Sequence, residues 1–263
     1  MKAKEIIEIM NKWAPPSLVD HWDNTGFQIG DDNKEVDKIL LALDLDYNVY
    51  KWAKLHDFKM IITHHPAIFT PMKSITTNSY KEGLIYNLIK DGIVVFNAHT
   101  NLDRAEGGLN DYLAKILGLK NLQVLEIDKM GEEVDHGYGR VGDIEEVSLS
   151  EYLQFIKGRL ETDYLIVYGE TEKTVKRVAV CGGSGAEFIT HAHRSNASIY
   201  VTGDIKYHDA QEGAELGITV VDAGHYHTEK IILPVIKEHL EKNLREKLHI
   251  EIWDKPSPPY KIY

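Results

Sequence analysis

The sequence predicts an α/β protein made of two duplicated α/β lobes with mostly parallel sheets. Short apolar runs alternate with amphipathic segments along most of the chain, as in parallel strands joined by covering helices. Two valines, a histidine and a carboxylate four residues later occur twice, at positions 126 residues apart (225 − 99 and 229 − 103). We therefore expect a first lobe over 1–125 and a second over 126–263, with a C-terminal helix able to pack back on the first lobe.

In the first lobe, the apolar spacing predicts a helix that begins at Lys4 and ends at Trp13, before two prolines. The segment from Trp22 to Gly30 contains two glycines and two amides, which indicates either turn chemistry or a loop that lines a pocket. The other elements alternate. Strands are expected over 39–43, 59–63 and 93–96, and helices over 47–55, 80–90 and 109–117.

The second lobe begins with a glycine-rich acidic stretch, 129–143, which indicates a linker or a β-rich crossover. Ser148 and Glu151 form a capping box that starts a helix ending near Leu160. Pro234 lies within the last helix, which runs to about 247, and marks either its start or a kink. Strands are expected over 164–168, 177–181, 198–202, 218–221 and, at a sheet edge, 249–253; helices are expected over 186–193 and up to 216.

The composition limits the functional classes. The formal net charge is −11, with 41 acidic and 30 basic side chains, so the surface repels phosphate backbones and general nucleic-acid binding is not expected. Cys181 is the only cysteine, which fits a reducing cytoplasm, and its place at a strand end indicates packing. The charged N-terminus and the lack of a long apolar run predict a cytoplasmic protein without membrane contact.

Two adjacent histidines, His64 and His65, follow a short apolar run and precede Pro66. They stand where a buried strand ends, which is the usual place for ligands in an α/β sheet. Adjacent residues leaving a strand point in different directions, so the pair fits two neighbouring metal ions better than one. A solvated or helix-capping pair of histidines is the alternative when this motif is taken alone.

The repeated motif adds more candidate ligands. His99 with Asp103, and His225 with Glu229, are spaced so that both side chains lie on one face of a helical turn. Taken alone, either acid is better explained by a favourable interaction with the dipole at the N-terminus of a helix. Together with the adjacent histidines they predict a metal site in the cleft between the lobes, and nitrogen with carboxylate ligands suits zinc, manganese, iron, cobalt or nickel.

Other polar positions have weaker signals. His99 and His208 are candidates for acid–base groups or for residues that orient ligands. The run from Gly182 to Gly185 fits either a phosphate-binding turn or a tight turn without a ligand. His191 and His193 are expected on the surface, and His239 is expected to be solvated.

Six motifs resemble one family, the GTP cyclohydrolase I type 2 homologues, also called Ngg-interacting-factor-like dinuclear metal proteins, and the resemblance covers the chain from about residue 4 to 245. The length resembles the short form of that family. The motifs are Trp22 to Gly26, Thr63 to Pro66, Ala98 to Asp103, Gly182 to Gly185, Thr202 to Asp209, and Asp222 to Glu229.

The resemblance implies a homohexameric ring with two divalent metal ions per chain. Carried over by position, the ligands are His64, His65, Asp103, His225 and Glu229. Glu229 would bridge the two ions. His65 and Asp103 would complete the coordination of one ion, and His64 and His225 that of the other. The implied reaction is hydrolytic opening of the imidazole ring of GTP with loss of formate, through attack of a metal-bound hydroxide on C8, with His99 or His208 moving protons.

Three functional hypotheses follow. The first is a metal-dependent hydrolase that acts on a small-molecule substrate, a purine nucleotide. The second is a phosphoesterase, because two metal ions about 3.5–4 Å apart suit in-line phosphoryl displacement. The third is a ring that binds metal without catalysis, as a scaffold or a metal chaperone. Release of formate or of phosphate distinguishes the three.

Overall fold

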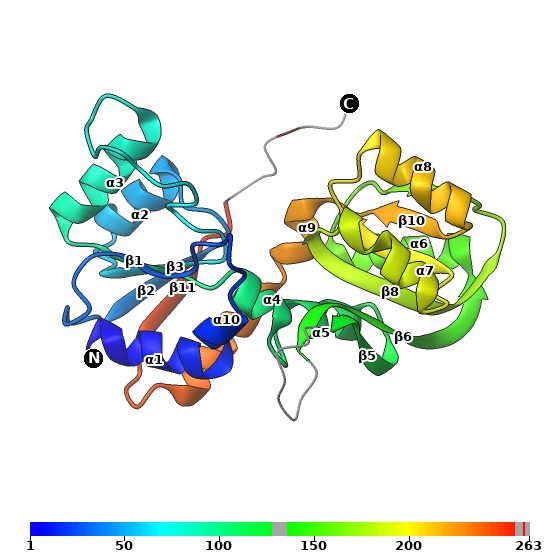
Figure 1. Cartoon of the computed structure of the whole chain (residues 1–263). Helices are drawn as coiled ribbons and strands as arrows, with labels where there is room; N and C mark the ends of the chain where they lie inside the picture. The colour runs from blue at the N-terminus through cyan, green and yellow to red at the C-terminus, as the bar shows by residue number, and fades with distance from the viewer. Residues whose placement is uncertain (128–135, 256–259, 261–263) are drawn as a thin grey trace. The chain divides into compact units, whose positions relative to one another are not determined.

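The computed structural model describes residues 1–127, 136–255 and 260. The chain divides into two compact units, whose elements are labelled in Figure 1. The first contains Met1–Leu102 and the segment from Leu233 onward, and the second contains Asp103–Ile232. The chain leaves the first unit within α4 (Thr100–Arg104) and returns to it at the start of α10 (Ile232–Asn243).

The first unit is built on a five-stranded sheet with the order β1-β4-β3-β2-β11. Four strands are parallel, and β1 pairs with β4 in the antiparallel direction. Almost every residue of the three central strands is buried, as expected when helices cover both faces of a sheet. The strands are β1 (Gly26–Ile29), β2 (Lys38–Ala42), β3 (Met60–Thr63), β4 (Val94–Asn97) and β11 (His249–Ile252).

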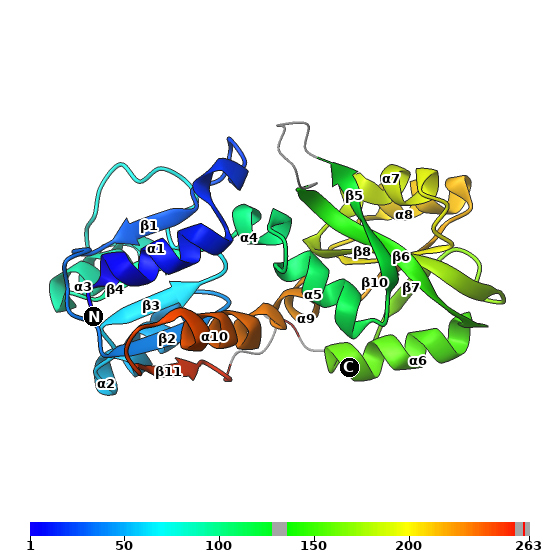
Figure 2. The same cartoon turned by 90° about the horizontal axis from the view of Figure 1, so that it is seen from below.

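Helices lie on both faces of this sheet. Figure 1 and Figure 2 show α2 (Tyr47–Leu55) and α3 (Tyr80–Asp91) on one face, and α1 (Ala3–Trp13) and α10 on the other. Leu40, Ile61 and Val95 share one buried cluster with residues of α2 and α3. Their neighbours along each strand are also buried and point to the opposite face, because successive side chains alternate across a strand.

The second unit contains a six-stranded sheet with the order β5-β6-β8-β9-β10-β7. Its three adjacent strands β8, β9 and β10 are parallel, and the flanking strands pair in the antiparallel direction. The strands are β5 (Lys120–Ile127), β6 (Gly137–Ser148), β7 (Ile166–Tyr168), β8 (Thr174–Ser184), β9 (Ile199–Gly203) and β10 (Thr219–Asp222).

Alternate residues of these strands supply two separate hydrophobic clusters. Val178, Ile199 and Val221 pack with α5 (Leu109–Ile116) and α6 (Leu149–Leu160). Ala179, Tyr200 and Val220 belong to the other cluster, with residues of α7 (Ile189–Arg194) and α8 (Tyr207–Leu216). The remaining short helical segments are η1 (Pro16–Leu18), η2 (Ala186–Phe188) and α9 (His225–Glu229).

The two units share an arrangement of four strands, as the repeat predicted. In each, three parallel strands follow in chain order (β2, β3, β4 and β8, β9, β10). In each, an antiparallel strand pairs with the last of the three, β1 with β4 and β7 with β10. A helical segment of five residues follows that last strand in both, α4 and α9. The predicted α/β class and the duplication are confirmed.

The bounds of the units differ from the predicted lobes of 1–125 and 126–263. Residues 103–125 fall in the second unit because β5 pairs with β6, and the C-terminal segment falls in the first because β11 pairs with β2. Two strands were missed: β1 lies where a loop was expected, and β5 where no element was expected. Of the predicted linker, 137–143 lies in β6, and 129–135 lies outside the described residues.

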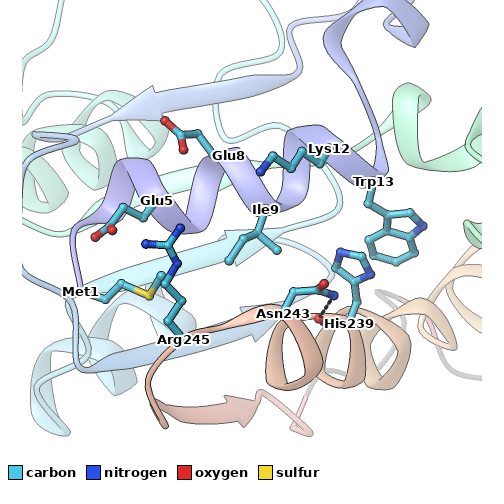
Figure 3. Close-up of a pocket in the computed structure, with 9 residues that line it drawn as sticks. All are labelled: Met1, Glu5, Glu8, Ile9, Lys12, Trp13, His239, Asn243 and Arg245. Atoms are coloured by element: carbon cyan, nitrogen blue, oxygen red, sulfur yellow. Dashed lines mark hydrogen bonds between the residues drawn. The ribbon is translucent and has the colours of Figure 1, made fainter.

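The prediction that His239 is solvated is wrong. Its ring stacks on that of Trp13, with centroids 4.3 Å apart and an interplanar angle of 19°. Both rings line a pocket of about 310 Å³ between α1 and α10, shown in Figure 3, which Glu5 and Arg245 also line. Burial lowers the pKa of His239, and the nearby charge of Lys242 lowers it further.

Within the part of the chain that the structure describes, no helix combines the length and the apolar character that crossing a bilayer requires.

Candidate metal centre

Three histidines of the first unit lie together at the ends of two neighbouring strands. His64 and His65 directly follow β3, and His99 follows β4 by two residues. One ring nitrogen from each lies within 4.8 Å of those of the other two. The ring centroids are 5.1 Å apart for His64 and His65, 5.3 Å for His64 and His99, and 5.5 Å for His65 and His99. This triad is compact enough for its members to bind one metal ion or two adjacent ones.

Each histidine of the triad is oriented through Nδ1. His64 Nδ1 lies 2.8 Å from the main-chain oxygen of Ala98, and His65 Nδ1 lies 2.7 Å from Asp44 Oδ1. His99 Nδ1 lies 3.0 Å from Asp23 Oδ1. An acceptor at Nδ1 fixes the tautomer that carries its proton there, so Nε2 is the nitrogen with which each ring would bind a metal ion.

Asp23 contacts His99 of the triad, a role that its sequence position did not predict. Its side chain is fully buried and accepts hydrogen bonds from Thr25 Oγ1 (2.5 Å) and Thr100 Oγ1 (2.7 Å) as well as from His99. Burial alone would raise its pKa, but these hydrogen bonds and the nearby imidazole outweigh burial and hold the pKa far below its usual range. Asp23 is therefore a carboxylate that holds the His99 ring in place.

The second unit contributes a histidine and a carboxylate from a single helical turn. His225 and Glu229 occupy the first and last positions of α9, and Nε2 of His225 lies 3.0 Å from Oε2 of Glu229. The predicted spacing of four residues thus directs both side chains to one point. His225 Nδ1 lies 2.8 Å from Asp204 Oδ2, so this ring too is oriented through Nδ1.

Glycines of β8 make room for the Glu229 carboxylate, which is only 3% exposed. A Cβ built on Gly183, whose φ is +68°, would lie 2.2 Å from Glu229 Oε1. The N–H groups of Gly182, Gly183 and Gly185 donate to side-chain oxygens of Asn110, Thr228 and Thr202, each at 3.0 Å. Because these donors are occupied, the glycine run serves packing around Glu229 and does not form a phosphate-binding turn.

Asp103 lies in the same unit as Glu229, near the end of α4, and is 9% exposed. Its main-chain oxygen accepts a hydrogen bond of 2.9 Å from Asn110 Nδ2. Burial raises the pKa of the Cys181 thiol in β8, and the charges of Asp103 and Glu229 raise it further, because both carboxylates lie near this thiol. The buried thiol packs in the core, as expected, and is a poor metal ligand because its thiolate is disfavoured.

The other predicted acid–base residue, His208, stands at the second position of α8 with an exposed side chain. Its ring lies edge-on to that of Tyr207, with centroids 5.2 Å apart. Of the two histidines predicted to lie on the surface, His193 is exposed and His191 is partly buried.

The residues present suit a transition metal. Four imidazoles are held through Nδ1, and buried carboxylates stand in the second unit. Neutral imidazole and carboxylate are the donors that zinc, iron, manganese, cobalt and nickel accept. In addition to Asp23, two other aspartates that orient histidines were not predicted, Asp44 and Asp204. Each is the first acidic residue after its strand, which was the available signal.

Comparisons with known proteins agree with the fold and with these motifs. The family model of Duf34/NIF3 (NGG1p interacting factor 3) matches residues 1–258. The GTP cyclohydrolase 1 type 2 homolog of Clostridium perfringens is 34% identical over 263 residues, covering 100% of both chains. The protein of the same name from Methanocaldococcus jannaschii is 37% identical over 246 residues, covering 93% of this chain and 96% of its own.

A solved structure of a Bacillus cereus protein related to NIF3 has a TM-score of 0.95 at 25% identity. The match covers 100% of this chain and 99% of that one. The family model and both curated relatives span nearly the whole chain, so the assignment does not depend on one motif. The chain belongs to the Duf34/NIF3 (NGG1p interacting factor 3) family.

Proposed function

We propose that this protein is a dinuclear metal-dependent hydrolase that opens the imidazole ring of a purine nucleotide, as the name of its relatives suggests. The observation that carries the proposal is the shared orientation of His64, His65 and His225, each bonded through Nδ1. Metal-binding histidines almost always donate their other ring N–H in this way, which fixes the ring direction and raises the basicity of the ligand.

In this proposal the ligands of two divalent metal ions are His64, His65, Asp103, His225 and Glu229. Glu229 would be shared by both ions, since it is almost fully buried and has two carboxylate oxygens to offer. His65 and Asp103 would complete the coordination of one ion, and His64 and His225 would complete that of the other. Bound divalent ions supply Lewis acidity and lower the pKa of water at the site.

His99 is the proposed proton carrier. Its Nδ1 donates to the buried Asp23 carboxylate, the arrangement by which an acid holds a catalytic imidazole in one tautomer and stabilises its protonated form. Release of formate takes two hydrolyses: one water opens the ring at C8, and a second water cleaves the remaining C–N bond of the formamide. In each, a proton leaves water and one reaches the departing nitrogen. His99 Nε2 would carry out both transfers, because Nδ1 is engaged. His208 is the second candidate for such a transfer.

The test is a screen of metal-loaded protein against GTP, ATP and the monophosphates, with formate and phosphate measured in the same samples. We expect formate from a purine nucleotide, and expect it to disappear in His99→Gln while the metal content stays the same. Tyr86→Ala, on the outer side of α3, is the control for unchanged turnover. Phosphate without formate would instead identify a phosphoesterase. Neither product from protein with two tightly bound metals would favour a metal-binding scaffold or chaperone.

A further inference from the structure

An exposed aromatic side chain of the first unit, Trp22, lies beside His99, and a second, Phe69, lies beside Trp22. Trp22, in the loop before β1, is 52% exposed, and its ring is edge-on to His99 with centroids 6.3 Å apart and an angle of 82°. Phe69, from the segment after the adjacent histidines, is 45% exposed and lies 6.1 Å from the Trp22 ring. Large aromatic rings left in water next to a polar site are typical of ligand recognition.

The loop that carries Trp22 is fixed relative to the histidines. Asp23, the next residue, bonds to His99 Nδ1 and to the N–H and Oγ1 of Thr100 at the start of α4. The N–H of Asp20 also donates to Thr100 Oγ1 at 3.1 Å. Because these contacts lie on both sides of Trp22, they fix its backbone, and those on one side come from the same carboxylate that orients His99.

Phe69 is held to the same loop by its neighbour Ile68. The main-chain oxygen of Ile68 accepts hydrogen bonds from Asn24 Nδ2 at 2.5 Å and from Gln28 Nε2 at 3.1 Å. The Ile68 N–H donates to Gln28 Oε1 at 2.9 Å. The two amides of the Trp22–Gly30 segment therefore tie the loop of Trp22 to the segment of Phe69, which gives these amides a structural role.

We propose that Trp22 and Phe69 form a stacking surface for the purine base of the substrate, next to the proton carrier His99. This inference rests on the proposed function, since it names the part of the substrate that the site recognises. An aromatic face binds any flat ring, and a purine offers a larger π-surface than a pyrimidine. The surface selects the base rather than the sugar or the phosphates, which carry no such ring.

Equilibrium dialysis of the metal-loaded protein with guanosine and with ribose 5-phosphate tests the proposal. Stacking on one aromatic side chain is worth about 5- to 150-fold in affinity, so Trp22→Ala should weaken guanosine binding by that factor. Trp22→Phe should retain most of it, because a ring remains, and Phe69→Ala should weaken it to a smaller extent. Ribose 5-phosphate binding should not change. Tyr86→Ala removes an aromatic ring that is 41% exposed elsewhere in the unit and should change neither.

The proposal is overturned if the wild type binds no guanosine, or if both alanine variants bind it as the wild type does. Formate release separates this result from the fate of the proposed reaction. If guanosine binding depends on Trp22 but no nucleotide releases formate, the stacking surface is supported and the hydrolase is contradicted. If Trp22→Ala releases formate with an unchanged KM, the hydrolase is supported and the stacking surface is contradicted.

Discussion

The two repeated motifs, His99 with Asp103 and His225 with Glu229, have the same sequence spacing but place their histidines differently. His225 is the first residue of α9, and its Nε2 lies 3.0 Å from the Glu229 carboxylate. His99 lies one residue before α4; one of its ring nitrogens belongs to the cluster with His64 and His65, and its Nδ1 bonds to Asp23 from a distant loop. We propose that the duplicated motif supplies a pair of metal ligands in the second unit and a proton carrier beside α4.

The largest effect should come from the carboxylate of α9. Glu229→Gln removes a negative charge from the proposed bridging position while keeping the size of the side chain, so we expect both metal ions to be lost on dialysis. Asp103→Asn should lose only one. Metal analysis per chain measures both results, and circular dichroism checks that the variants remain folded. Retention of two ions by Glu229→Gln, or loss of one alone, would remove its bridging role.

His99, just before α4, should behave differently. His99→Gln should lower kcat by about 10²–10⁴, the usual contribution of a general acid or base, with the metal content unchanged. The readout is formate release at saturating nucleotide, together with metal analysis of the same sample. If metal is lost instead, His99 is a ligand like His225, and the contrast between the two turns disappears.

The carboxylates that orient the histidines should have an intermediate effect in both units. Asp44→Ala and Asp204→Ala remove the acceptors of His65 and His225, and each should lower metal affinity by about 10- to 100-fold. Titration against a chelator gives the affinities. Asp57→Asn is the matched control, because this exposed aspartate pairs with Lys59 and an amide suits its φ of 61°. An effect in only one unit would mean that the other histidine does not bind metal.

The glycine run around Glu229 allows a smaller test of the second unit. Gly183→Ala places a methyl group 2.2 Å from Glu229 Oε1 at a positive φ, so we expect destabilisation of at least about 1 kcal/mol and weaker metal binding. Gly158→Ala in α6 meets no atom within 4 Å and should stabilise by about 0.5–1 kcal/mol. Urea unfolding measures both changes. Equal stability of the two variants would show that the carboxylate position is adaptable.

Metal removal should have the smallest effect on assembly. We expect a homohexamer in sedimentation experiments both with metal and after chelation, because we expect the contacts between subunits to lie away from the metal ligands. A monomer in the presence of metal would contradict the hexamer. A hexamer that dissociates on chelation would show that the metal site also supports the assembly.

Local sequence was sufficient for several features of this protein. Apolar runs such as Ile61–Ile62 and Val220–Val221 predicted buried strands, since only a sheet covered on both faces buries successive residues. The spacing of His225 and Glu229 predicted their contact, because four residues make about one helical turn. Ser148 and Glu151 marked the start of α6 through a capping box that the structure contains.

The residues that orient the histidines could not be assigned from local spacing. Asp44 and His65, like Asp204 and His225, are 21 residues apart, and Asp23 and His99 are 76 apart. Each of the first two pairs forms because neighbouring parallel strands bring their carboxyl ends together, which requires the strand order. The sequence by itself determined which side chains stand at strand ends. The tertiary structure alone decided which acid orients which histidine, because pairing between distant strands depends on the packing of the whole sheet.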